Sequence, residues 1–408
     1  MDYLIGLTGV VVIFGLAFIL SEAKRDINLR TVGIAFAIQF SIGLLVFYSS
    51  IGEQVLQSIT DAVQHVIDYG KVGVEFVFGE LTGNKLGFIV AFNVLPIIIF
   101  FSAFMSVLYY LGIMPLIIRT LGAFLSKCLG TSRTESISAA ANVFVGMTEA
   151  PIVVKPYINK LTRSELFAVM VGGLASSAGT MLAAYSSLGI DLKYLIAASF
   201  MAAPGGLLMA KIMVPETSPD DIVEATEANF EEDDQPVNVV DAAASGAITG
   251  LHLAANVGAM LIAFIALVAL VNGLIGYVGG LVGIDGLSLQ TILSYIFSPL
   301  AYLLGVSWSE AQIVGALLGE KIILNEFVAF ASFIGQQDML SERSQVITTF
   351  ALCGFANLGS LAILLGGLGG MAPSRRHDIA RMGIKAVIAG TLANLMSAAI
   401  AGFIFLLN

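Results

Sequence analysis

The chain has 408 residues, of which 57% are hydrophobic and 12% are charged, and its mean hydropathy is +0.92. Because soluble domains carry roughly 25% charged residues, this composition excludes an ordinary soluble domain and indicates a protein that crosses a membrane several times. The formal net charge of −10 comes largely from one acidic segment, residues 215–241. We therefore expect a lipid bilayer as the chain's surroundings and no nucleic-acid partner.

Apolar runs long enough to cross a bilayer recur along the chain, each with roughly 18 or more residues. We expect eight spans, at residues 3–20, 31–49, 88–118, 166–188, 195–214, 238–276, 344–368 and 384–406. Residues 52–85 carry apolar side chains at helical spacing among acids, which predicts an amphipathic helix in the plane of the membrane. Residues 286–304 predict a second in-plane helix.

Two segments are too polar for a simple span and too apolar for a loop. Residues 134–161 predict a re-entrant hairpin that turns at 146–148, with Thr148 as the N-cap of the returning arm and Glu149 in its first turn. Residues 308–337 repeat the pattern, with Asn325 as N-cap and Glu326 beside it. Because a carboxylate within an apolar run is costly, both acids mark a candidate functional site.

Each hairpin precedes a span whose centre is rich in small and polar residues, at 172–180 and at 353–360. Such stretches predict helices that unwind at mid-membrane. Three spans separate the two hairpins, so the two copies enter the membrane from opposite faces. The fold class that follows is an all-α polytopic membrane protein with eight spans, two hairpins of opposite orientation, interfacial helices and an inverted repeat, the architecture of secondary transporters.

This reading divides the chain into five parts. They are a scaffold part at 1–133, a first transport repeat at 134–214, an acidic linker at 215–241, further scaffold at 242–305 and a second transport repeat at 306–408. With both termini outside, most of the 19 Lys and Arg residues fall on the inner side, as the positive-inside rule requires.

The interrupted helices predict chemistry at the centre. Broken helices expose N–H groups at one end, which suit a neutral, hydroxyl-bearing solute, and carbonyls at the other, which suit a cation. In the first repeat, oxygens of four residues could form a cage that contains no carboxylate: Asn142, Val145, Ser176 and Ser177. A neutral cage suits a monovalent cation better than Mg²⁺ or Ca²⁺, which usually recruit acids. On the residues alone, the serines could equally be small packing residues between helices.

Three motifs carry a family resemblance that covers nearly the whole chain. The stretches 148–151 (TEAP), 325–329 (NEFVA) and 354–357 (GFAN) resemble the signatures of the concentrative nucleoside transporters. The resemblance implies a homotrimer in a bacterial cytoplasmic membrane that imports nucleosides with Na⁺, or with H⁺ in some members.

The resemblance also implies roles for residues. The family's base-contacting positions fall on Met147, Thr148 and Glu149, and its sodium ligands fall on the four residues of the oxygen cage. Its ribose-contacting positions fall on Glu326, Asn357 and Ser360, with Phe355 beside them.

The chain departs from the family pattern around the base. Met147 stands where the family usually has Gln, and its thioether is at best a weak hydrogen-bond acceptor. Met181 stands where a small residue or valine is common, and Ala255 where a larger aliphatic residue contacts the base. We therefore expect an unusual or broadened base specificity. Glu320 is an additional acid without a place in this scheme.

Two other classes of function stay open on the sequence. A passive channel would need a continuous polar pore, and two single acids are weak support for one. An intramembrane enzyme would need a nucleophile–base pair or a metal set, and the spans contain no Ser–His, paired-Asp or His/Glu constellation. Cys128 and Cys353 are expected to be packed thiols.

Overall fold

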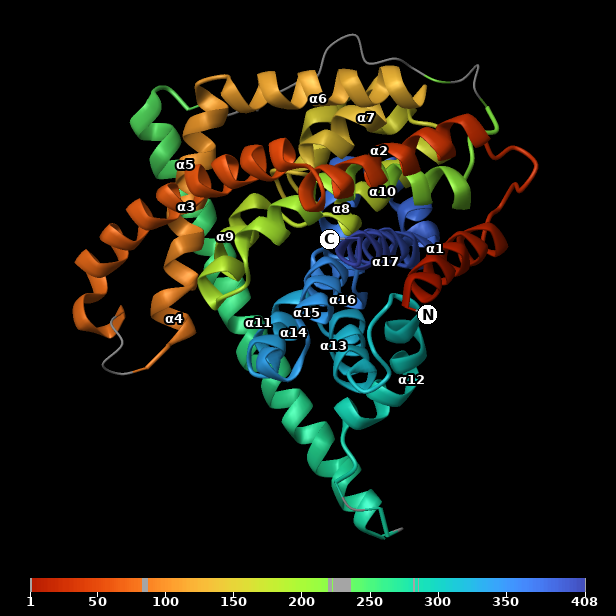
Figure 1. Cartoon of the computed structure of the whole chain (residues 1–408). Coiled ribbons are helices and arrows are strands. Elements are labelled where there is room, and N and C mark those ends of the chain that lie inside the picture. Colours follow the sequence, from red (N-terminus) through yellow and green to blue (C-terminus); the bar gives the residue numbers. More distant parts are fainter. Residues whose placement is uncertain are drawn as a thin grey trace.

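The computed structural model describes residues 2–82, 87–218, 222, 236–281, 283–284 and 286–407, and all regular structure within these ranges is helical (Figure 1). Most of the predicted acidic linker lies outside the described residues. The first two predicted spans are α1 (Asp2–Ile19) and α2 (Leu29–Phe47), and the amphipathic helix is α3 (Ser50–Phe78), extended by η1 (Gly79–Thr82).

The predicted third span, 88–118, is wrong in its extent. The structure has α4 (Val90–Asn93), α5 (Leu95–Tyr110) and then a separate helix α6 (Ile113–Leu129). The chain turns at Gly112, whose φ of +76° lies in the left-handed region that glycine adopts without strain. Helix α6 runs beside α7 along one edge of the molecule (Figure 1).

The first hairpin consists of α7 (Arg133–Ala141), an irregular stretch at 142–149 and η3 (Ala150–Lys160). The prediction of Thr148 as N-cap is wrong: the residue at the cap is Glu149, and no side-chain bond caps the helix. The returning arm is a 3₁₀-helix, with prolines at 151 and 156. A proline in an α-helix interior removes a hydrogen bond and clashes with the preceding turn, which accounts for the departure from α-helix.

The second hairpin consists of α13 (Ala311–Ile323) and α14 (Glu326–Ile334), followed by η5 (Gln337–Met339). Asn325 is the N-cap of α14, as predicted, and its side-chain oxygen accepts a hydrogen bond of 2.9 Å from the backbone N–H of Val328. Insertion of the two hairpins into the membrane from opposite faces stays a prediction.

Both spans predicted to unwind are broken. The first consists of α8 (Arg163–Ala175) and α9 (Gly179–Leu188), and the second of α15 (Glu342–Leu352) and α16 (Leu358–Met371). The remaining helices are α10 (Leu192–Met213), α11 (Val239–Leu281), α12 (Leu289–Leu303), η6 (Pro373–Arg375) and α17 (Arg376–Phe405).

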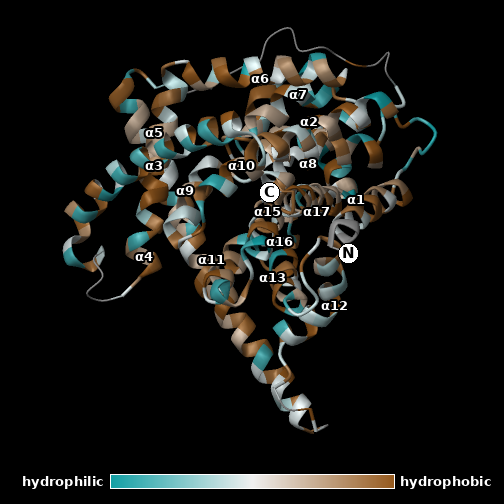
Figure 2. Cartoon of the chain, viewed as in Figure 1, coloured by the Kyte–Doolittle hydropathy of each residue, from teal (hydrophilic) through white to brown (hydrophobic). Residues whose placement is uncertain are grey.

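Six segments in the described part of the chain are long and apolar enough to cross a membrane: 29–47, 90–110, 163–188, 192–213, 239–281 and 373–405. The shorter apolar helices are Gly6–Ile19 of α1, and the whole of α12 and α16. The lower half of α11 extends away from the other helices, and apolar residues line much of its length (Figures 1 and 2).

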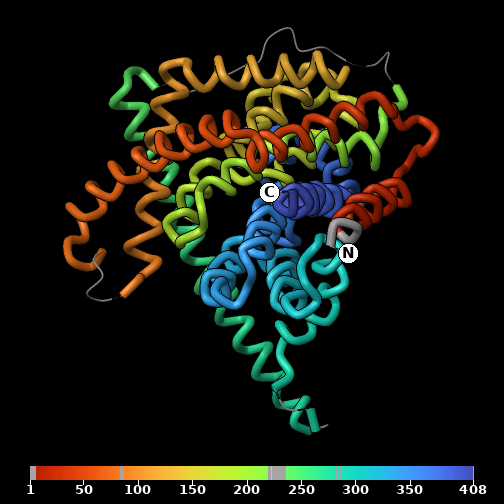
Figure 3. The backbone as a smooth tube through the Cα atoms, in the orientation of Figure 1, coloured from red at the N-terminus to blue at the C-terminus, as the bar shows by residue number. Residues whose placement is uncertain are grey.

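Helix α17, the last helix of the predicted second repeat, contacts helices of both repeats. It packs against α8 and α10 of the first repeat and against α15 and α16 of the second, and it is seen nearly end-on at the centre of Figure 3. Small residues make this close packing possible, because a Cβ added at Gly390 would lie 2.9 Å from Leu174 Cβ. The two broken spans are therefore held against one common helix.

Candidate functional site

A buried polar cluster forms where the tip of the second hairpin meets both broken spans. Glu326, the first residue of α14, is 5% exposed. Its Oε1 accepts a hydrogen bond of 3.0 Å from the Tyr185 hydroxyl, and its Oε2 accepts one of 3.1 Å from Asn357 Nδ2. The carboxylate stands at the start of a helix, where the helix dipole favours a negative charge.

Asn357 has two functions in this cluster. As N-cap of α16, its Oδ1 accepts a hydrogen bond of 2.8 Å from the backbone N–H of Ser360. Its Nδ2 remains available for Glu326. Asn357 and Ser360 are each 3% exposed, and Phe355 lies half-buried in the break between α15 and α16. The predicted ribose-contacting residues Glu326, Asn357 and Ser360 are therefore brought together.

The cluster includes Tyr185, which the sequence reasoning missed. It lies on α9, is completely buried, and packs its ring against Phe330 at a centroid distance of 4.6 Å. A phenol within an apolar span was the available signal, since a buried tyrosine hydroxyl usually finds a hydrogen-bond partner. The first repeat thus contributes a donor to the acid of the second.

The four residues of the predicted oxygen cage are all buried, with exposures of 1% for Asn142, 6% for Val145, 2% for Ser176 and 0% for Ser177. Asn142 Nδ2 donates to Ser138 O at 2.9 Å, while its Oδ1 has no hydrogen-bond partner among the described residues. A buried oxygen without a donor is costly, and a cation would satisfy it. The donor set is neutral and all-oxygen, which fits Na⁺.

Two glycines allow the first hairpin to approach α8 closely. A Cβ added at Gly172 would lie 3.2 Å from Asn142 Nδ2, and one added at Gly173 would lie 2.7 Å from Met147 Cβ. The Asn142 side chain is thereby held against the last turn of α8, directly before Ser176. The predicted cage therefore draws on two elements that touch at this point.

The residues predicted to face the base differ in how deeply they are buried. Met147 and Met181 are buried, with exposures of 5% and 4%. Thr148 is half-buried and lies against α16, since a Cβ added at Gly367 would be 2.9 Å from its Cγ2. Glu149 is exposed. Ala255 lies exposed on α11, so the described contacts do not join it to the cluster.

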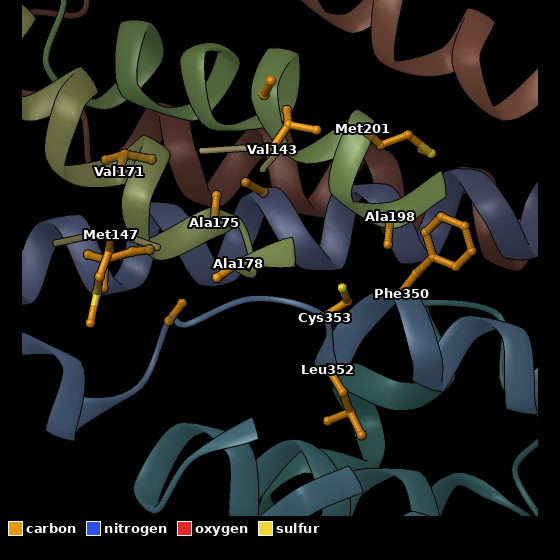
Figure 4. Packing of buried hydrophobic residues seen from close by; sticks show 14 of the residues in the cluster. Val143, Met147, Val171, Ala175, Ala178, Ala198, Met201, Phe350, Leu352 and Cys353 are labelled. Atoms are coloured by element: carbon orange, nitrogen blue, oxygen red, sulfur yellow. The ribbon is translucent and has the colours of Figure 1, made fainter. Parts of the chain in front are cut away.

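The break between α8 and α9 contacts the break between α15 and α16. The backbone N–H of Phe355 donates to Ser176 O at 3.1 Å, and Asn394 Nδ2 on α17 donates to Ala175 O at 2.6 Å and to Cys353 O at 3.0 Å. In Figure 4 the segment that follows Cys353 passes close to Ala175 and Ala178. Asn394 was also missed by the sequence reasoning.

Glu320, the acid that the sequence leaves without a role, is hydrogen-bonded to a neighbouring helix. It lies on α13, is 3% exposed, and accepts a hydrogen bond of 3.0 Å from Gln290 of α12. Gln290 in turn accepts one of 2.9 Å from Asn272 of α11. Glu320 therefore belongs to a contact between the second hairpin and its neighbouring helices rather than to the cluster around Glu326.

Family models match nearly the whole chain. The model for the N-terminus of Na⁺-dependent nucleoside transporters matches residues 8–81, one for nucleoside recognition matches 91–191, and the model for the C-terminus of Na⁺-dependent nucleoside transporters matches 194–402.

Several relatives agree with the family models. An uncharacterised transporter of Haemophilus influenzae is 55% identical over 98% of both chains. The nucleoside permease NupC of Helicobacter pylori is 51% identical over 99% of this chain and 98% of its own. The mouse sodium/nucleoside cotransporter 1 is 39% identical over 99% of this chain and 64% of its own.

Solved structures of CNTnw match the fold closely at 53% identity. CNTnw in an inward-facing, substrate-bound state has a TM-score of 0.94 and covers 99% of this chain and 100% of its own. A doubly substituted variant in an outward-facing state has a TM-score of 0.97 and covers 100% of both chains. The chain therefore belongs to the Na⁺-dependent, concentrative nucleoside transporter family and is a polytopic membrane transporter rather than an enzyme.

Proposed function

We propose that this chain is a symporter that imports nucleosides with Na⁺ by alternating access. The observation that carries the proposal is the buried Glu326–Asn357–Tyr185 cluster, which joins both repeats beside a neutral oxygen cage. CNTnw, which shares the fold, is known in inward-facing and outward-facing states.

Glu326 binds the ribose. An ionised carboxylate has two oxygens with about four acceptor positions, and Tyr185 and Asn357 use one on each oxygen. The remaining positions accept hydrogen bonds from two neighbouring sugar hydroxyls. Ser360 and Asn357 stand at the start of α16, where helix N–H groups suit a hydroxyl oxygen. A neutral diol is thus bound without a second charge.

Met147, Thr148 and Met181 face the base, and Glu149 contacts it directly or through water. Two buried thioethers replace directional hydrogen bonds with polarizable apolar contact, so the base pocket accepts more than one ring pattern. We propose a broadened base specificity that rests on this pair of methionines. Phe355 lies beside the sugar and limits the space around it.

The Na⁺ site of the symporter lies in the first repeat. Asn142 Oδ1, the Val145 carbonyl and oxygens of Ser176 and Ser177 hold Na⁺ and fix α8 against the first hairpin. Ser176 O already accepts from the N–H of Phe355, so the order gained at the cation site reaches the loop that precedes Asn357. Coupling follows because the bound cation has already ordered the elements that the substrate requires.

We further propose a homotrimer in a bacterial cytoplasmic membrane, with both termini outside. The long apolar helix α11, with an apolar window that is only 6% buried within the subunit, supplies surface for lipid or for subunit contacts.

The division of each subunit into a scaffold and a moving part stays a proposal. Hydrogen bonds from Gln39 to Ser397 and from Lys385 to Glu22 connect α2 and the loop before it with α17. On the strength of these contacts we propose that α1 and α2 move together with the repeats, and that the scaffold part predicted at 1–133 is limited to its later helices.

Uptake of radiolabelled nucleosides into proteoliposomes tests the function. We expect accumulation with an inward Na⁺ gradient and none with choline, and an H⁺ gradient alone tests the proton-coupled alternative. Glu326→Gln should abolish accumulation, while Glu75→Gln, which changes an exposed acid on α3, should not. Uptake that ignores both gradients and does not saturate with nucleoside would point to a passive channel and overturn the proposal.

A further inference from the structure

Lys321 is a buried cationic residue, and the proposed transport cycle does not use it. It lies in the last turn of α13, its side chain is 1% exposed, and it is among the largest fully buried side chains. None of the ion pairs formed between described residues includes it. Placing an ammonium inside an apolar protein is costly unless it is fully hydrogen-bonded, so its position calls for a functional reason.

The Lys321 ammonium binds one helix-end carbonyl and one side-chain amide oxygen instead of a carboxylate. Its Nζ donates to Ala351 O and to Asn394 Oδ1, each at 2.7 Å. In an unbroken helix, Ala351 O would accept from the N–H of Phe355. That N–H donates instead to Ser176 O, which leaves Ala351 O at the broken end of α15 free for the ammonium.

In the first repeat a broken helix also ends in a carbonyl that has lost its intrahelical N–H partner, but no charged side chain like Lys321 is supplied there by the described residues. In an unbroken helix, Ala175 O would accept from the N–H of Gly179, which donates instead to Phe144 O of the first hairpin. At this break the first hairpin supplies the neutral Asn142, whose Oδ1 has no partner among the described residues. The first break therefore lacks a cation that the protein itself could supply.

The two breaks correspond through the inverted repeat. In each, the end of a hairpin's first arm meets the carbonyl end of a broken span: α7 with α8, and α13 with α15. Asn394 joins the two, because its Nδ2 donates to Ala175 O and Cys353 O while its Oδ1 accepts from Lys321. The negative ends of both half-helices thus meet at one side chain.

We propose that the Lys321 ammonium is a resident cation, which takes in the second repeat the place that Na⁺ takes in the first. The chain then needs one transported Na⁺ per nucleoside, because the second helix end is neutralised permanently. Lys321 is a positioning residue: it holds the break that carries Phe355 and Asn357, and it acts on substrate only through them. This inference rests on the proposed Na⁺ site of the first repeat.

The negative charge of Glu326 favours the ammonium form of Lys321. Glu326 is the carboxylate whose charge acts on Lys321, and Glu326 is the single acid of the cluster around the proposed ribose site. An ammonium that donates to Ala351 O and Asn394 Oδ1 offsets the charge of Glu326 without using an acceptor position on its carboxylate. Loss of the ammonium would leave both the carboxylate and the end of α15 without a cation.

Na⁺-dependent nucleoside binding by the purified protein tests the proposal, with binding of uridine and of adenosine measured by calorimetry at graded NaCl in a choline background. For the wild type we expect a Na⁺ Hill coefficient of about 1. For Lys321→Ala, which leaves room for an ion, we expect the coefficient to approach about 2 and half-saturation to need roughly 10-fold more Na⁺. Ethylammonium should restore the wild-type coefficient in Lys321→Ala.

Two further variants separate charge from hydrogen bonding. Lys321→Gln keeps a donor without the charge, so half-saturation should need more Na⁺ than in the wild type, as in Lys321→Ala, whereas Lys321→Arg should keep the wild-type Na⁺ dependence. Lys211→Gln is the matched control, because Lys211 is also buried but pairs with Glu135 at 2.6 Å; it should keep the wild-type coefficient too. Wild-type Na⁺ dependence in Lys321→Gln would overturn the proposal.

A measurement on the unaltered protein covers the case in which the variants do not fold. The reversal potential of nucleoside flux in proteoliposomes gives the ion stoichiometry, and we expect about 1 Na⁺ per nucleoside. A ratio of about 2 in the wild type would overturn the resident cation while leaving Na⁺ symport intact. Absence of any Na⁺ dependence in the wild type would instead overturn the proposed function itself.

Discussion

At the scale of single residues, the acid of the proposed ribose site is oriented by a tyrosine from the other repeat. Tyr185→Phe removes the hydrogen bond of 3.0 Å to Glu326 Oε1 and keeps the ring packed against Phe330. A hydrogen bond to a charged group contributes roughly 1.5–3 kcal/mol, so we expect nucleoside affinity to fall roughly 10-fold or more. Calorimetry in saturating Na⁺ measures it.

The control for that change is Tyr194→Phe on α10, a half-buried tyrosine whose ring stacks on Phe47 at 5.8 Å. It should leave nucleoside affinity within about 2-fold of the wild type, because the Tyr194 ring packs on Phe47 and Phe350 and keeps these contacts as phenylalanine. Equal losses in both variants would show that Tyr185 has only a packing role.

Met147 sets how far the family's base preference applies to this chain. Met147→Gln introduces an amide with one acceptor and two donors at a buried position beside Gly173. We expect the variant to discriminate between bases roughly 10-fold more strongly than the wild type. Competition of uridine, cytidine, adenosine and guanosine against labelled uptake measures this, and Met181→Leu should leave the order of preference unchanged. A Met147→Gln variant with the wild-type order would contradict the role given to Met147.

The motifs pointed to Glu326, Asn357 and Ser360, which the structure brings together, but they could not predict the partners of those residues. Tyr185 and Glu326 are 141 residues apart, and Asn394 and Ala175 are 219 residues apart. Such contacts depend on how two repeats and α17 pack, and no local pattern encodes that packing. The contact of Ala255 with the base, which the resemblance implies, stays a prediction, since Ala255 lies exposed on α11.

At the scale of elements, short sequence patterns predicted features that depend only on neighbouring residues, such as a helix cap and two helix breaks. Asn325 was predicted as a cap because an amide three residues before a free N–H can satisfy it. The two breaks were predicted from glycine and polar residues at the centres of spans. Thr148 was assigned wrongly because Pro151 and Pro156 shape the returning arm as a 3₁₀-helix. Helix α6 was missed because the apolar run continues across the turn at Gly112.

Gly354 tests whether the crossing of the two breaks matters. A Cβ at this position would lie 2.7 Å from Ala175 O and would also meet the Asn394 amide, so Gly354→Ala forces the two broken spans apart. We expect the thermal unfolding temperature to fall by roughly 5 °C or more, as overpacking costs about 1–3 kcal/mol, and Na⁺-driven uptake to be lost.

Gly366→Ala on α16 is the matched control, because a Cβ there would have no neighbour within 4 Å. In a helix interior, alanine is favoured over glycine by roughly 0.5–1 kcal/mol, so this variant should be as stable as the wild type or slightly more so. Full uptake by Gly354→Ala would show that the close crossing is not required.

At the scale of the whole molecule, one acid in the loop between α1 and α2 joins both repeats. Glu22 Oε1 lies 3.0 Å from Arg163 Nη2 at the start of α8 and 3.0 Å from Lys385 Nζ on α17. Together with the buried hydrogen bond of 2.8 Å from Gln39 to Ser397, these contacts attach the first two spans to the repeats. The positive-inside rule predicts Arg163 and Lys385 on the inner side, but the sequence could not pair them with Glu22.

Glu22 also makes the stability of the folded protein depend on pH. The hydrogen bond from Arg163, followed by that from Lys385, holds the pKa of Glu22 below its ordinary value of 4.5. Because the pKa is lower in the folded state, the stabilisation is present above about pH 4.5 and is lost as the pH falls through the folded value.

Glu22→Gln should therefore unfold roughly 1–3 °C below the wild type at pH 7, a small shift because the pair is partly exposed to solvent. The difference should shrink below about pH 4.5 and then disappear, since both proteins carry a neutral side chain there. Asp26→Asn in the same loop is the control and should show no such convergence. A gap that keeps its size down to about pH 3 would mean that Glu22 stabilises the fold by packing, and that charge plays no part in attaching α1 and α2 to the repeats.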